Sequence, residues 1–180
     1  MTTTDARLNA VQIEAVGDLV DTITTNPDAA ATVWSASVRW DGAFRSSATV
    51  RGFEPIPSDE PAGLGGDDTA PNPVEQLLGA LGNCLAVGYA ANATVRGIAI
   101  DDLRIDLRGD LDLHTFLGLD PDGHAGFRSI DAEVHLRTDA EPDAVAALHA
   151  AVAATSPVGH TLQRPIPLDI RPVDQEGPSR

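Results

Sequence analysis

Cys84 is the only cysteine in the 180-residue chain, and it is the residue best suited to nucleophilic or redox chemistry. It lies in a long uncharged stretch, QLLGALGNCLAVGYAANATV, that spans residues 76–95. A cysteine reacts as its thiolate, which apolar surroundings disfavour, and a lone cysteine among Leu, Ala and Gly usually behaves as a small core residue. The helix dipole fades within the first turn, so a reactive Cys84 needs a cation from another segment. An arginine suits this role because it stays charged when partly desolvated.

Glu75 is the only acidic residue of the helix that this stretch predicts. It precedes Cys84 by nine positions, which places the two side chains half a turn out of phase and about 13 Å apart along a straight helix. The two cannot touch. Glu75 therefore either caps the helix or orients the arginine that activates the thiol.

The five histidines predict neither a metal site nor a hydrolase. None shows the spacing of zinc ligands, and we expect no metal and no cofactor. His135 falls on the polar face of a strand and His149 in a helix, so we expect both to be solvated. His160 follows Ser156 in the segment SPVGH, but no GxSxG nucleophile elbow accompanies a Ser/His/Asp hydrolase. The complete set is His114, His124, His135, His149 and His160.

The charge and cysteine content of the chain exclude several classes of binding partner and of structural site. Twelve Lys and Arg against 27 Asp and Glu give a formal charge of −15, which argues against binding to nucleic acid or to anionic membranes. One cysteine allows neither an intrachain disulfide nor a multi-cysteine zinc site. The uncharged stretch contains glycines and asparagines, so we expect a helix buried in a soluble protein rather than a membrane span. The N-terminus shows no secretory signal pattern, and we expect a cytoplasmic protein.

The N-terminal half predicts a helix, a hairpin and a loop before the cysteine helix. Residues 7–24 have helical apolar spacing, and two strands at 32–39 and 44–52 flank a turn at Trp40-Asp41-Gly42. The Pro-, Gly- and Asp-rich loop 53–71 is long enough to be either a linker or part of a site.

The cysteine helix has clear ends, and the second half continues with strands and a helix. Asn72 and Glu75 form a capping-box pattern, Pro73 suits the first turn, and Gly97 suits the C′ position after a helix ending near Arg96. Beyond it we expect strands at 101–113 and 128–138, a helix at 142–154 and a final strand at Ile166, Leu168 and Ile170. The order αββαββαβ predicts an α+β fold with helices on one face of an antiparallel sheet.

Three segments make the chain similar to the OsmC/Ohr family of thiol-dependent hydroperoxide reductases: GGDDTAPNPVEQLLGALGNCLA (65–86), GDLDLHTFLGLD (109–120) and SPVGHTLQRPIPLDI (156–170). The resemblance spans roughly residues 32–173. It implies an OsmC-like α+β fold, with antiparallel sheets packed on long buried helices in an intertwined homodimer. We therefore divide the chain into an N-terminal helical extension (1–30), an OsmC-like domain (31–175) and a tail (176–180).

The resemblance also implies roles for individual residues. Cys84 matches the cysteine that attacks the peroxide, whereas Ser156, before Pro157, stands where the family has a second, resolving cysteine. A serine cannot form a disulfide, so an external thiol would have to reduce the oxidised Cys84. The family also uses an arginine near the hairpin turn, for which Arg39 and Arg45 are the candidates, together with Glu75.

These implications give a first hypothesis and two alternatives. The first is a one-cysteine peroxidase for small apolar hydroperoxides, with Leu78, Leu81 and Leu85 as apolar lining. The second is a non-redox protein that binds small molecules and retains the homodimeric fold. The third is a protein that carries or exchanges low-molecular-weight thiols on Cys84.

Overall fold

In a computed structural model, which describes residues 7–173, the protein has the α+β organisation that its sequence predicts. The helices are η1 (Leu8–Ala10), α1 (Ile13–Thr25), η2 (Pro27–Ala30), η3 (Ala62–Leu64), α2 (Pro73–Val95), α3 (Leu113–Phe116), α4 (Pro142–Thr155) and α5 (Pro157–Gln163). The strands are β1 (Ser37–Gly42), β2 (Arg45–Thr49), β3 (Ile56–Ser58), β4 (Asp102–Leu111) and β5 (Phe127–Arg137). The tail expected at 176–180, and the first residues of the expected extension, lie outside the described range.

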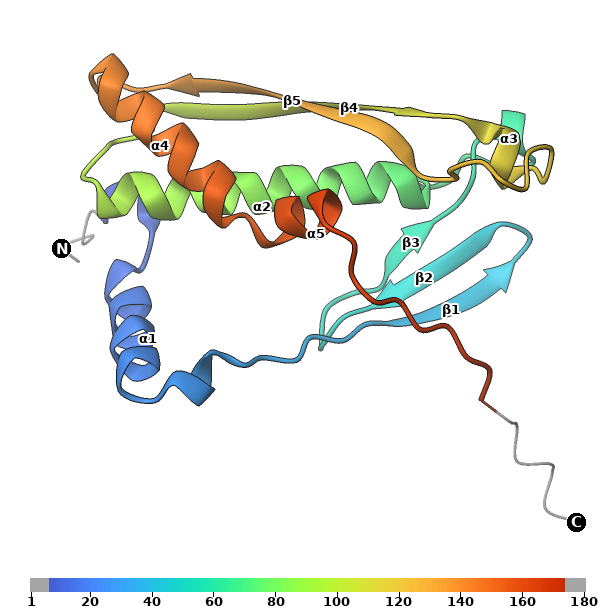
Figure 1. The fold of residues 1–180 in the computed structure, drawn as a ribbon, viewed down its shortest axis with the longest axis horizontal. Coiled ribbons are helices and arrows are strands. Elements are labelled where there is room, and N and C mark those ends of the chain that lie inside the picture. Colours follow the sequence, from blue (N-terminus) through green and yellow to red (C-terminus); the bar gives the residue numbers. More distant parts are fainter. Residues whose placement is uncertain (1–6, 174–180) are drawn as a thin grey trace, which may run out of the picture.

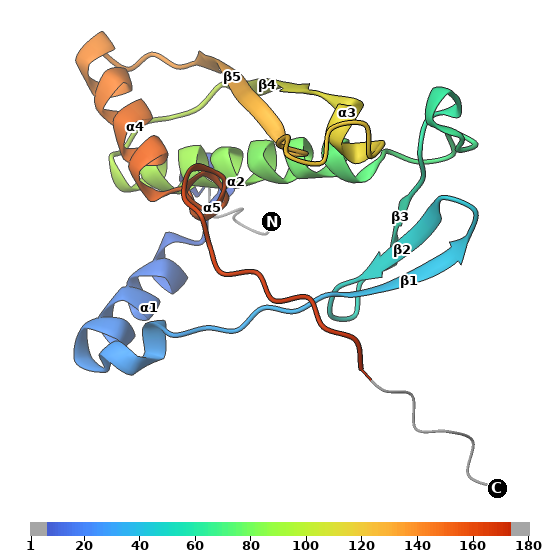
Figure 2. The same cartoon turned by 45° about the vertical axis from the view of Figure 1, so that its right-hand side comes forward.

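Helix α2 is the centre of the fold. The β4–β5 pair runs along one side of it, and α4 and α5 cross it, while the β1–β3 sheet stands apart from this layer (Figures 1 and 2). The buried core lies where α2, α4 and the start of β4 meet, and comprises Tyr89, Ala93, Ile98, Leu148 and Val152. None of the helices in residues 7–173 has the length and apolar character needed to cross a lipid bilayer.

The β4–β5 pair follows the alternation of its sequence. The strands are antiparallel, with Ile105 opposite Val134 and Leu103 opposite Leu136. These side chains pack against the core, while the alternating arginines and aspartates of β4 face outward. The alternation of apolar and charged residues along the strands thus fixes which face of the β4–β5 pair covers α2.

The first sheet has the order β1-β2-β3, and its turn differs from the prediction. Ala43 and Phe44 form the turn, because Gly42 pairs with Arg45 after an irregularity in β1. Gly42 has a φ of +99°, which suits glycine. The predicted loop 53–71 contains β3 and η3, and the buried carboxylate of Asp59 holds its far end by accepting hydrogen bonds from backbone N–H groups and the hydroxyl of Thr69.

Several elements differ from those that the sequence predicts. The first helix begins at Ile13 rather than residue 7, because Asn9 adopts a left-handed conformation (φ 52°) and binds the end of α2. A short α5 follows Pro157, which the sequence analysis did not predict. The predicted final strand around Leu168 is wrong for the single chain, since residues 164–173 pair with no strand and the side chain of Leu168 is 80% exposed. Alternating apolar residues need a partner strand to form a ladder.

The expectation that α2 is buried on most sides also needs correction. Leu81, Tyr89 and Ala93 are buried, but Val87, on the opposite side of the helix, is 70% exposed. In the single chain, α2 therefore keeps one uncovered face.

Candidate functional site

The N-terminus of α2 has the capping box predicted from its sequence. The side-chain oxygen of Asn72 accepts a hydrogen bond from the Glu75 backbone N–H at 2.9 Å, and a carboxylate oxygen of Glu75 accepts one from the Asn72 N–H at 2.9 Å. Gly97 ends the helix with a φ of +69°. The cap reading of Glu75 is confirmed. Within residues 7–173, Glu75 forms no ion pair with an arginine.

Two glycines of α2 allow close packing around the cysteine. A Cβ at Gly82 would lie 2.8 Å from a methyl carbon of Leu107 in β4, and one at Gly88 would lie 3.1 Å from Val152 in α4. Both distances are shorter than ordinary contact. The small residues of the uncharged stretch therefore bring β4 and α4 against the helix on either side of Cys84.

Ser156 connects α4 to α5 and faces the thiol. It is 5% exposed, and its hydroxyl oxygen lies 3.2 Å from the Cys84 sulfur. The same oxygen accepts a hydrogen bond from the Gly159 N–H at 3.0 Å, as the N-cap of α5. Its own hydrogen is therefore free to be donated to the sulfur. The position that the resemblance aligned with a resolving cysteine is thus adjacent to Cys84 in space.

The two candidate arginines lie on the first sheet and are paired with carboxylates there. Arg39 contacts Asp41 at 3.2 Å on β1, and Arg45 on β2 contacts Asp67 at 2.6 Å. Neither contacts Cys84 within the described part of the single chain. The site formed by one chain alone therefore contains the thiol and the serine hydroxyl but no guanidinium.

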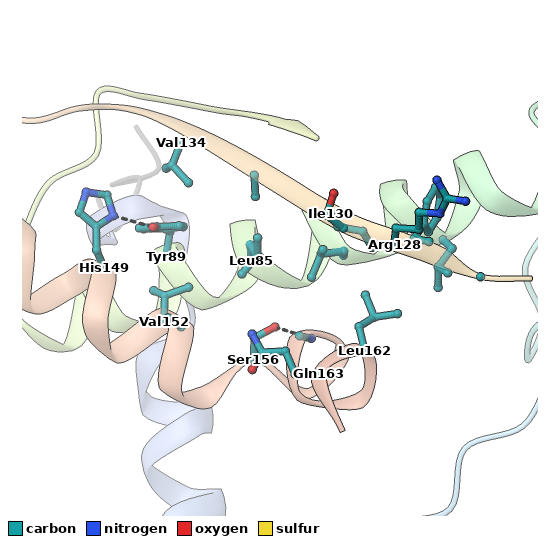
Figure 3. Close-up of a pocket in the computed structure, with 18 of the residues that line it drawn as sticks. Leu85, Tyr89, Arg128, Ile130, Val134, His149, Val152, Ser156, Leu162 and Gln163 are labelled. Atoms are coloured by element: carbon teal, nitrogen blue, oxygen red, sulfur yellow. Dashed lines mark hydrogen bonds between the residues drawn. The ribbon is translucent and has the colours of Figure 1, made fainter. Parts of the chain in front are cut away.

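A cavity of about 610 Å³ adjoins this site between α2, β5, α4 and α5. Its wall includes Leu81 and Leu85, as the sequence suggested, but not Leu78 (Figure 3). Ser156 also lines it, whereas Cys84 does not. At 100° per residue, the Cys84 side chain is turned about 60° from Leu81 and about 100° from Leu85, which both line the cavity. The cavity therefore reaches the thiol through Ser156.

Tyr89 and His149 form a polar pair at one end of the cavity that the sequence analysis missed. The tyrosine oxygen lies 2.6 Å from Nδ1 of His149, and the rings meet edge-on at 78° (Figure 3). The expectation that His149 is solvated is wrong, because α4 packs it against α2. His149 lies seven positions after Pro142, the first residue of α4, and its surroundings in the sequence give no signal of this contact. The tyrosine of α2 was the available clue, because a buried tyrosine hydroxyl usually has a hydrogen-bond partner.

Comparison with protein families matches residues 65–171, more than half of the chain, to the family described as OsmC-like protein. The chain belongs to the OsmC-like family. This confirms the resemblance to the OsmC/Ohr family drawn from the sequence.

Solved structures agree with this OsmC-like fold. An OsmC-like protein from Mycoplasma pneumoniae has 19% identity and a TM-score of 0.64, covering 73% of this chain and 88% of its own. An organic hydroperoxide resistance protein OsmC from Legionella pneumophila has 17% identity and a TM-score of 0.55, covering 74% and 92%. An OsmC-like protein of unknown function from Vibrio cholerae has 12% identity and a TM-score of 0.59, covering 72% and 93%. Comparison with curated protein sequences finds no match.

Proposed function

We propose that this OsmC-like protein reduces organic hydroperoxides through the single thiol of Cys84, with an external thiol as reductant. The observation that carries the proposal is the 3.2 Å contact between the Cys84 sulfur and the Ser156 hydroxyl. A hydroxyl that donates to the sulfur stabilises the thiolate. The same hydroxyl can donate to the oxygen of a sulfenate formed on that sulfur.

The reaction runs in two halves. The thiolate attacks the outer oxygen of ROOH, the O–O bond breaks, and Cys84 becomes a sulfenic acid while RO⁻ leaves and takes a proton as ROH. An external thiol R′SH then attacks the sulfenic sulfur, releasing water and leaving a mixed disulfide. A second R′SH breaks that disulfide, giving R′SSR′ and free Cys84. Ser156 takes no part in electron transfer.

We also propose that the protein works as a homodimer. The chain exposes 13,970 Å² of surface, whereas a compact protein of 18.8 kDa exposes about 8,300 Å². The exposed face of the first sheet and turn carries large apolar side chains: Val38, Trp40, Phe44 and Ile56. A second copy would cover these residues and the uncovered face of α2.

Dimerisation would also complete the site. The single chain leaves Arg39 and Arg45 on a sheet that stands apart from α2 (Figure 2). In the dimer, the first sheet of one protomer packs near Cys84 of its partner and supplies the guanidinium that holds the thiolate. Glu75 remains a helix cap that positions α2.

Turnover with cumene hydroperoxide and dithiothreitol tests this function. Cys84→Ser should abolish peroxide consumption, and either Arg39→Ala or Arg45→Ala should slow it about 100-fold. Arg108→Ala is the matched control, because Arg108 is an exposed arginine paired with Asp110 on β4. Equal turnover by the wild type and Cys84→Ser would refute the proposal.

The cavity favours a second candidate, a non-redox small-molecule-binding protein. Its wall contains Ser156 but not Cys84, and it is lined mainly by apolar side chains. Such a protein would keep ligand binding when Cys84 is replaced by serine.

A further inference from the structure

The Tyr89–His149 pair, a buried tyrosine bonded to a half-buried histidine, is a polar feature that the thiol chemistry does not use. Tyr89 is 4% exposed, and both rings line the cavity (Figure 3). The pair lies at the opposite end of the cavity from Arg128 and Leu162, with Ser156 between. Polar groups placed in an otherwise apolar cavity fix the orientation of a ligand.

The hydrogen-bonding capacity of the pair does not depend on which partner donates. If the tyrosine O–H donates to Nδ1, the pair still offers the tyrosine oxygen as an acceptor and the His149 Nε2–H as a donor. If Nδ1–H donates, the pair offers the tyrosine O–H as a donor and Nε2 as an acceptor. In either state the pair presents one donor and one acceptor at separate positions, because the two ring nitrogens of an imidazole point in different directions. A ligand hydroxyl group suits either position, since it both donates and accepts.

The cavity beyond the pair is long, and most of the side chains that line it are apolar. Leu77, Leu81, Leu85 and Tyr89 recur every four residues on α2, so this wall is about 18 Å long. Ile130 and Val134 of β5 face it. A volume of about 610 Å³ lies within the range of small-molecule sites, and this shape fits an extended aliphatic chain.

The charges around the cavity favour a neutral ligand. Arg128 is at its far end, but its guanidinium is paired with Asp112. Hydrogen bonds from the backbone N–H and then the ring of His114 lower the pKa of Asp112 to about 2, so this carboxylate is ionised at neutral pH. Burial raises the pKa of Tyr89, so the phenol is uncharged there. In the cavity wall formed by residues 7–173 of one chain, Arg128 is the only arginine, and its pairing with Asp112 leaves no free guanidinium there for an anionic head group.

We propose that the cavity between α2, β5 and α4 binds a neutral, elongated aliphatic molecule bearing one hydroxyl group, which bonds to the Tyr89–His149 pair. This inference develops the non-redox candidate function and does not require Cys84 to react. The aliphatic chain lies along the leucine stripe of α2 and passes Ser156.

The test uses 1-decanol as the probe and the full-length protein. Tyr89 is the only tyrosine, so protein labelled with ¹³C at tyrosine Cζ gives one signal from the inner end of the cavity. We expect 1-decanol to shift that signal saturably in the wild type and in Cys84→Ser, with sodium decanoate binding at least about tenfold more weakly. Calorimetry should show about fivefold weaker binding to Tyr89→Phe, which loses only the phenol hydroxyl.

Ala153 and Ala150 provide a matched pair on α4. Ala153 lines the cavity and Ala150 does not, although both are exposed enough to accept a larger side chain. Ala153→Phe should abolish the shift, and Ala150→Phe should not change it. No saturable shift in the wild type, equal binding of decanoate, or full binding by a folded Ala153→Phe variant would overturn the proposal. Loss of peroxide turnover in Cys84→Ser with decanol binding intact separates this site from the thiol reaction.

Discussion

The Cys84 sulfur lies 3.2 Å from the hydroxyl oxygen of Ser156, although the two residues are 72 positions apart in the chain. The contact arises because α4 ends at Thr155 and α5 begins at Pro157, so Ser156 caps α5 and turns toward α2. A serine therefore occupies the place from which a second thiol could reach Cys84.

Ser156→Cys should give a disulfide with Cys84. The two side-chain atoms are already 3.2 Å apart, and side-chain rotation can close that gap to the roughly 2 Å of an S–S bond. After treatment with cumene hydroperoxide, the variant should show no titratable thiol. Reduction of the disulfide should restore both thiols. Thr155→Cys is the control, because the Thr155 hydroxyl binds Ala151 O within α4; it should keep a free thiol. A Ser156→Cys variant that never crosslinks would contradict the geometry.

Asn9→Ala should detach the N-terminal segment from the end of α2. The Asn9 amide donates to Thr94 Oγ1 and Ile98 O at 3.0 and 2.9 Å, and its oxygen accepts from the Ile100 N–H at 2.8 Å. Loss of these bonds should weaken the attachment of the N-terminal segment to the end of α2 by about 2 kcal/mol. Hydrogen exchange should then quicken in α1 while α2 and α4 stay protected. Slow exchange in α1 of the variant would show that other contacts hold it.

Asp59→Asn should loosen the loop around Thr69. The Thr69 hydroxyl and backbone N–H groups lower the pKa of Asp59, so its stabilising effect is complete above the usual aspartate pKa of about 3.9. The effect is lost as pH falls through the lowered value in the folded protein. Protection factors for the amides of Asp67 and Thr69 should therefore fall on acidification in the wild type and be low at all pH in the variant. Asp68→Asn, an exposed neighbour, should behave like the wild type; similar loss in both variants would argue against a role of Asp59.

Val87→Asp should weaken the proposed homodimer. Val87 is 70% exposed on the uncovered face of α2, and a carboxylate buried there at an interface would have no partner. We expect the dissociation constant to rise about 30-fold, as at an interface hot spot. Light scattering across a concentration series measures it. A wild-type mass of one chain at micromolar concentration would contradict the dimer.

Much of the fold could be predicted because the residues that cap helices agree with the spacing of apolar residues along the chain. Asn72, Glu75 and Gly97 set the ends of α2, and alternation in residues 102–111 and 127–137 set the strands. The final strand around Leu168 could not be judged, because the sequence shows that a segment alternates but not whether a partner strand lies beside it. The start of the first helix shifted because Asn9 makes distant bonds to Thr94 and Ile98.

The candidate site was only partly predictable, because local sequence patterns do not show which distant segments come into contact. Cys84 was identified by its residue type and Ser156 by the family resemblance, and the fold brings the two together. The Tyr89–His149 contact depends on how α4 crosses α2, which no local pattern encodes. Arg39 and Arg45 lie on a sheet that stands apart from Cys84 in the single chain, and only the proposed homodimer would bring either of them to the thiol.

The most direct test of the central claim is the rate at which Cys84 loses its thiol to cumene hydroperoxide in a stopped-flow experiment. Because Cys84 is the only cysteine, every thiol lost belongs to the site. We expect a second-order rate constant roughly 100-fold or more above that of free cysteine at the same pH, with a sulfenic acid as the product. A rate no faster than that of free cysteine would contradict it.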